Sequence, residues 1–254
     1  MGSQKHDPMV ISMIMLNSPQ LPRIEDIVSA YTRMWSETPR FKSPKQENDI
    51  LTFDCKAGLC AIALMPAPIP WNNIEGPCST AWYWAEAEEV LKPHRSHIII
   101  TMQQRTDRVS IALAVTKLTA TVASLLMAPG IYWGDGTLVH STESFLQQAK
   151  VMSREYLPLY LWVDFRVNRN DDNSLTLFTT GLSAFDLMEI EVVHSLLQPD
   201  LLIDKAFNIA HYLLDNGPVL KDGDTIGVSE SERISVRHQQ SVWPSRSLVY
   251  RIQC

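Results

Sequence analysis

The feature that most constrains the fold is the apolar stretch over residues 97–134. It opens with the β-branched run His97–Met102, whose composition predicts a buried strand. Thr106 and Asp107 follow as candidate N-cap residues of a helix over residues 108–127. That helix is apolar on nearly every side. We therefore expect other elements to cover both of its faces, which would make it the centre of the core.

The rest of the chain alternates between strand-like and helix-like patterns. This predicts the α+β class, with mixed or antiparallel sheets packed with about five helices. The predicted helices are residues 23–37, 81–91, 108–127, 142–152 and 199–215. The predicted strands are residues 10–16, 50–53, 60–65, 97–102, 131–133, 157–167, 175–180, 188–193 and 247–252. Residues 37–48 are polar and contain two prolines, so we expect a surface loop there.

The length of 254 residues is sufficient for one large domain with a sizeable hydrophobic core. No shift in composition marks a linker between two domains. We therefore expect a single α+β domain over residues 1–254, or two intimately packed halves over residues 1–150 and 151–254.

The formal net charge of −6 argues against a nucleic-acid-binding protein, because phosphate contacts need clustered Lys and Arg. It suits a soluble protein or one that meets a basic partner. The apolar run over residues 9–16 is too short for a signal peptide. Thr, Ser and Lys residues dilute helix 108–127, which argues against a membrane span. Four cysteines are too few for a disulfide framework, so we expect a cytoplasmic protein.

Several phrases of the sequence occur together along the chain. They are MPAPIPW at 65–71, HIIITM at 97–102, GIYWGDG at 130–136, LPLYLWV at 157–163, TTGLSAFDLMEIEV at 179–192, HYLLDNGPVLKDGDTIG at 211–227 and VRHQQSV at 236–242. With them the chain resembles the bacterial family called domain of unknown function 4261, most specifically from Gly181 onward. The resemblance implies a cytoplasmic α+β protein and carries over no catalytic residues. Proteins of this kind look similar to the immunity or accessory partners of bacterial secreted toxins, including those of type VI secretion.

The candidate metal ligands do not have the spacing of a common zinc site. They are Cys55, Cys60, Cys78, His94 and His97. The chain also lacks a G-x-S-x-G motif, an H-E-x-x-H motif and a glycine-rich phosphate loop. We therefore expect a non-catalytic protein with no metal and no cofactor.

Acidic residues in predicted turns and polar loops are the first candidates for a binding surface. They are Asp171, Asp172, Asp186, Glu189, Glu230 and Glu232. An acidic surface can steer quickly onto the basic cleft of a nuclease. The favoured hypothesis is thus an immunity protein that binds and neutralises a cognate bacterial toxin. Glu189 and Glu191 alternate along one predicted strand, so we expect both carboxylates on one solvated face.

Two other functions remain open at this point. Trp71, Trp82, Trp84 and Trp133 could line a pocket for a small molecule, as in a binding protein or an enzyme. Core packing is the competing explanation for these tryptophans. The protein could also be an adaptor of a secretion apparatus, and the sequence does not specify an oligomeric state.

Overall fold

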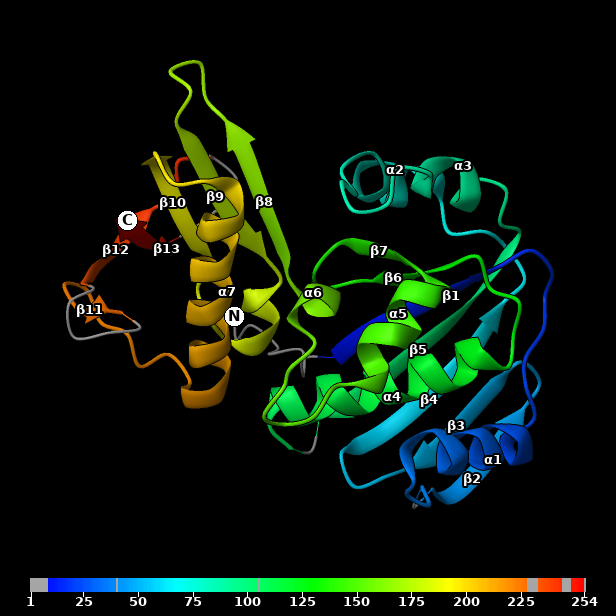
Figure 1. Cartoon of the computed structure of the whole chain (residues 1–254). Coiled ribbons are helices and arrows are strands. Elements are labelled where there is room, and N and C mark those ends of the chain that lie inside the picture. Colours follow the sequence, from blue (N-terminus) through cyan, green and yellow to red (C-terminus); the bar gives the residue numbers. More distant parts are fainter. Residues whose placement is uncertain (1–8, 40, 105, 228–232, 244–247, 254) are drawn as a thin grey trace, which may run out of the picture. The chain divides into compact units, whose positions relative to one another are not determined.

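The structure, a computed structural model, confirms the predicted α+β class through its helices and its two mostly antiparallel sheets (Figure 1). The residues that it describes are 9–39, 41–104, 106–227, 233–243 and 248–253. The chain divides into two compact units, unit 1 (Met1–Leu161) and unit 2 (Trp162–Cys254).

Unit 1 is built on a seven-stranded antiparallel sheet with the strand order β2-β3-β4-β5-β1-β6-β7. Its strands are β1 (Met9–Leu16), β2 (Lys42–Glu47), β3 (Ile50–Asp54), β4 (Gly58–Met65), β5 (Ser96–Gln104), β6 (Gly130–Trp133) and β7 (Leu138–Ser141). The predicted central strand is confirmed, because β5 pairs with β1 on one side and with β4 on the other. Ile98, Ile100 and Met102 alternate along β5 and are fully buried.

Helix α4 (Arg108–Ser124) packs on β1 and β5, and it is flanked by α1 (Ile24–Trp35) and α5 (Thr142–Lys150). Eleven of its 17 residues are buried, which confirms that other elements cover both of its faces. The side chain of Asp107 accepts a hydrogen bond from the Ser110 N–H, which confirms the predicted N-cap. Within the described residues, no helix has both the length and the apolar character that crossing a bilayer requires.

The predicted helix over residues 81–91 is wrong in its bounds, because only the last five residues of this range are helical and a separate helix ends before it. α2 spans Trp71–Ser79 and α3 spans Ala87–Leu91. The N–H and the hydroxyl of Thr80 both donate to the carbonyl of Gly76, so Thr80 closes the last turn of α2 as its C-cap. The proline-rich segment over residues 66–70 leads directly into α2, with Pro70 at its N-cap.

Two further predictions fail, the second only in part, where a short element has no clear pattern. The predicted loop over residues 37–48 contains β2, an edge strand whose side chains are all exposed. Because only its backbone has to match β3, its sequence shows no period-two alternation. The predicted strand over residues 157–167 begins instead as the short helix α6 (Leu159–Trp162), and only its last four residues are confirmed as strand, in β8 (Asp164–Arg169).

Unit 2 contains a six-stranded sheet with the strand order β11-β12-β13-β10-β9-β8. Its strands are β8 (Asp164–Arg169), β9 (Leu175–Thr180), β10 (Ile190–Ser195), β11 (Thr225–Ile226), β12 (Ile234–Gln240) and β13 (Leu248–Gln253). The pair β10 and β13 is parallel, since the chain leaves β10 through α7 (Pro199–Asn216) before it returns to the sheet. α7 contacts β8, β9 and β10, and it begins with Pro199 at its first position as predicted.

Candidate functional site

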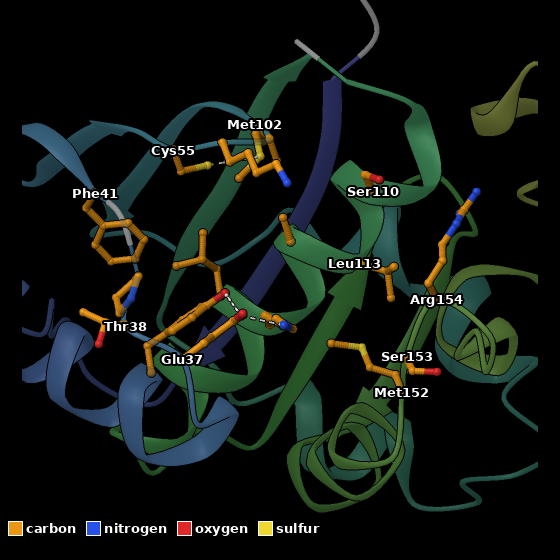
Figure 2. A pocket seen from close by; sticks show the side chains of 17 residues that line it. Glu37, Thr38, Phe41, Cys55, Met102, Ser110, Leu113, Met152, Ser153 and Arg154 are labelled. Atoms are coloured by element: carbon orange, nitrogen blue, oxygen red, sulfur yellow. Dashed lines mark hydrogen bonds and ion pairs between the residues drawn. The ribbon is translucent and has the colours of Figure 1, made fainter.

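A pocket of about 650 Å³ lies within unit 1, over the N-terminal half of α4 (Figure 2). Five separate parts of the chain form it: α1 with the segment that follows it, the β3–β4 turn, β5, α4 and residues 152–154. Figure 2 shows Thr38 and Phe41 on one side of the pocket and Met152 and Arg154 on the other. The pocket is therefore a product of the tertiary fold.

The floor of the pocket is one stripe of α4. Ser110, Leu113, Ala114 and Lys117 line the pocket and are only partly buried, whereas most of the helix is fully buried. Their spacing of three and four residues places them on the same side of the helix. Ser110 and Lys117 are thus polar positions of a nearly apolar helix that face the pocket.

Aromatic rings and a thioether supply the apolar walls. The rings of Tyr31 and Phe41 meet edge-on with their centroids 5.9 Å apart. The ring centroids of Phe41 and Phe53 are 4.0 Å apart. Met152 reaches toward the pocket from the opposite side. These groups suit an apolar or aromatic part of a ligand.

One carboxylate faces the pocket from the described residues that line it, and it is already engaged. Glu37 accepts a hydrogen bond from the Tyr31 hydroxyl at 3.0 Å and from the Lys117 ammonium at 2.6 Å. The bond from Lys117 holds the pKa of Glu37 below its ordinary value, although partial burial opposes this. Lys117 also lies 5.5 Å from the centroid of the Trp35 ring, which fixes its ammonium further.

Two more cations line the pocket. Lys56, on the β3–β4 turn, forms no ion pair with the described residues. Arg154 lies 3.8 Å from the Asp107 carboxylate, and 46% of its side chain is exposed. The described lining therefore carries three cations against the one carboxylate of Glu37, in a chain with a net charge of −6.

The cysteine and histidine side chains named as possible zinc ligands have other roles in unit 1. The Cys55 thiol lies at the pocket, 3.3 Å from the Gly58 carbonyl and 4.0 Å from the Met102 sulfur. His94 accepts from the Ile69 N–H at 2.8 Å, and the His97 ring bonds the Ala67 carbonyl at 2.8 Å. These two bonds hold the proline-rich segment against the start of β5 and the residues that precede it. No cluster of three potential ligands forms among the residues that the structure describes.

The structure does not bring the four predicted tryptophans into one site. Trp71 and Trp84 pack, half-buried, against the apolar cluster beneath α2 and α3. Trp82 is 66% exposed, and Trp133 is buried in the core against Phe145. The pocket over α4 is lined by none of them.

The structure also separates the predicted acidic residues. Asp171 and Asp172 lie in the β8–β9 turn at one end of β9, where Asp172 accepts a hydrogen bond from the Ser174 N–H. A hydrogen bond from the Ser174 hydroxyl, together with the one from its N–H, lowers the pKa of Asp172. Asp186 and Glu189 follow the other end of β9.

Asp186 is exposed, whereas Glu189 is half-buried and stabilises the segment that follows β9 through hydrogen bonds. Its carboxylate accepts from the Thr179 hydroxyl at 2.7 Å and from the N–H groups of Gly181 and Ser183 at 3.0 and 3.1 Å. Glu230 and Glu232 lie outside the residues that the structure describes. The described acidic candidates therefore do not form one patch.

The predicted solvated face of β10 is wrong for Glu191, which is 1% exposed. Its carboxylate lies 2.6 Å from the Arg251 guanidinium and accepts from the Ser241 hydroxyl at 3.1 Å. Period-two alternation predicts only that Glu191 lies on one face of β10, and it does not show that other residues of unit 2, such as Ser241 and Arg251, cover that face.

Residues 178–253 match the family model described as domain of unknown function (DUF4261). The matched region runs from β9 to β13 within unit 2, which agrees with the resemblance seen in the sequence from Gly181 onward. No curated protein matches the chain. Because the pocket over α4 belongs to unit 1, the DUF4261 match assigns nothing to it.

Proposed function

We propose that this protein is a non-catalytic binding protein that takes a small molecule into the pocket over α4. The observation that carries the proposal is the pocket itself. Its volume of about 650 Å³ falls in the range of ligand sites, and apolar walls surround a few converging polar groups. This is one of the alternatives expected from the sequence, at a different place from the predicted tryptophans.

The chemistry of the lining favours binding over catalysis. The Glu37 carboxylate is neutralised by Lys117 and hydrogen-bonded by Tyr31, so it is poorly placed to accept a proton. The Cys55 thiol donates toward a backbone carbonyl, and the described lining contains no histidine that could activate it.

A variant that fills the pocket tests the proposal. Ala114→Phe adds a ring to the pocket floor, and Ala85→Phe adds the same ring at an exposed turn position outside it. Melting temperatures are measured with a library of metabolites. We expect some compounds to stabilise the unmodified protein and Ala85→Phe, but not Ala114→Phe.

The unliganded melting temperature of Ala114→Phe shows that it is folded. The proposal fails if no compound stabilises the unmodified protein, or if the same compounds stabilise Ala114→Phe equally.

The predicted role of an immunity protein is a second proposal, favoured by the charge of −6 and by the exposed carboxylates of Asp171 and Asp186. It requires a cytoplasmic location, which stays a prediction, as does the adaptor role. Co-expression with toxins encoded beside the gene tests it. Loss of toxicity, reversed by Asp171→Lys with Asp186→Lys, is the expected result, and unchanged toxicity with every such toxin would exclude this role.

A further inference from the structure

We propose that the ligand of the pocket over α4 is an organic acid with an apolar body and one anionic head group. This inference rests on the proposed binding function and names the chemical class that the pocket selects.

Charge is the first argument. Lys56, Lys117 and Arg154 come from three different elements and line the same pocket, opposed by the carboxylate of Glu37. The lining is thus positive within a protein of net charge −6, whose overall field would repel an anion. A local excess of cations in such a chain favours an anionic head group at this place.

The engagement of Glu37 argues against a cationic ligand. Its carboxylate already accepts from Lys117 and Tyr31, so a ligand ammonium would have to displace one of them. A ligand anion instead meets Lys56, which has no ion pair with a described residue, and the partly exposed Arg154. Charge-assisted hydrogen bonds from such groups are about twice as strong as neutral ones.

The walls argue for an apolar body and against a compact or multiply charged anion. Tyr31, Phe41, Leu113 and Met152 offer rings and flexible aliphatic groups across the pocket. A polyphosphate would leave this apolar surface uncovered, whereas a hydrocarbon chain or an aromatic ring buries it. The head group and the body of an organic acid use both halves of the lining.

Three probes of equal chain length separate the head group from the body. Decanoate, decanol and decylamine are titrated, below their micelle concentrations, into the full chain and followed by calorimetry. We expect decanoate to bind at least about tenfold more tightly than decanol, because a charged hydrogen bond adds that much or more. Decylamine is expected to bind most weakly.

Variants assign the effect to the pocket. Lys56→Gln combined with Arg154→Gln should reduce the affinity for decanoate about tenfold and leave that for decanol unchanged. Glu37→Gln should increase the affinity for decanoate, since it removes the carboxylate that competes for Lys117. Arg95→Gln, an exposed cation outside the pocket, is the matched control and should change neither.

The outcomes distinguish the ligand class from the binding function. If decanol or decylamine binds as tightly as decanoate, the class is wrong and the pocket is still a binding site. If none of the probes binds while other compounds stabilise the protein in an Ala114-dependent way, the class is likewise wrong. If no compound binds at all, the class and the proposed function both fail.

Discussion

The carboxylate of Glu191 on β10 lies 2.6 Å from the guanidinium of Arg251 on β13, and the two residues are paired in register across parallel strands. The Glu191 side chain is 1% exposed and that of Arg251 is 9% exposed. The Ser241 hydroxyl donates to the same carboxylate. This buried pair therefore joins the last strand of the chain to the centre of the sheet of unit 2.

Removing one member of this pair leaves the other charge buried without its partner. We expect Glu191→Ala to lower the free energy of unfolding by about 3 to 5 kcal/mol. Asp171→Ala, at an exposed turn position of the same unit, should change it by less than about 0.5 kcal/mol. Chemical denaturation of the full chain measures both.

A double variant separates the unpaired charge from lost packing. Glu191→Leu with Arg251→Leu leaves no buried charge, so it should recover most of the stability lost in Glu191→Ala. A double variant as unstable as the single one would mean that packing and shape, rather than the orphaned charge, account for the loss.

The error at Glu191 shows where sequence patterns reach their limit. Alternation along β10 was visible, and so were the helix over residues 108–127 and its Asp107 cap, because each is encoded within a few neighbouring residues. Whether a strand face is covered depends on residues far along the chain. Arg251 is 60 positions from Glu191, and no local pattern links them.

The pocket over α4 likewise depends on residues that are far apart in the sequence. Phe41, Cys55, Lys117 and Arg154 come from different parts of the chain, and no spacing rule brings them together. Ser110 and Lys117, polar positions in a nearly apolar helix, were the signal that this helix is not covered everywhere. Of the predicted tryptophans, Trp71, Trp84 and Trp133 instead pack in apolar clusters, and Trp82 is exposed. Large aromatic rings contribute to packing at least as often as to binding.

His140 makes unit 1 sensitive to acid. Its side chain is buried and stacks on Tyr83 with the ring centroids 5.8 Å apart. Burial lowers the pKa of His140 to about 4, although a hydrogen bond with the backbone of Leu161 opposes this shift. The unfolded chain binds this proton near pH 6.5, so the contribution of His140 to stability is present above pH 6.5 and is lost as the pH falls toward 4.

We expect the free energy of unfolding to decrease by about 3 kcal/mol across this window through His140. His140→Phe keeps an aromatic ring beside Tyr83 and Phe145 and should remove this part of the pH dependence. Denaturation curves at pH 7, 5.5 and 4.5 make the comparison. An equal pH dependence in the variant would show that other groups cause it.

Asp135 should act in the opposite sense. Burial raises the pKa of Asp135 to about 6, against the effects of Arg108 and of the Ile11 backbone hydrogen bond. The folded protein therefore holds this proton more tightly than the unfolded chain, and stability is lost as the pH rises from about 4 through 6. We expect Asp135→Asn to increase the free energy of unfolding at pH 8 by about 1 kcal/mol, after allowance for its partial exposure.

Near pH 3 the Asp135 carboxyl is mostly protonated in both states, so Asp135→Asn and the unmodified protein should then have nearly equal stability. A stabilisation that persists unchanged at pH 3 would point to packing or hydrogen bonding instead of desolvated charge.

Asp107 begins the helix on which the pocket is built. Its carboxylate accepts from the Ser110 N–H at 3.0 Å and from the Ser110 hydroxyl, and these bonds keep the pKa of Asp107 low although burial opposes them. Asp107→Ala leaves that N–H without its cap and should lower the free energy of unfolding by about 1 kcal/mol. Asp107→Asn keeps a capping oxygen and should retain most of the stability, and Asp171→Ala, in an exposed turn, is the control. Equal losses in Asp107→Asn and Asp107→Ala in urea denaturation would assign the effect to the charge near Arg154, since the cap is intact in the first variant.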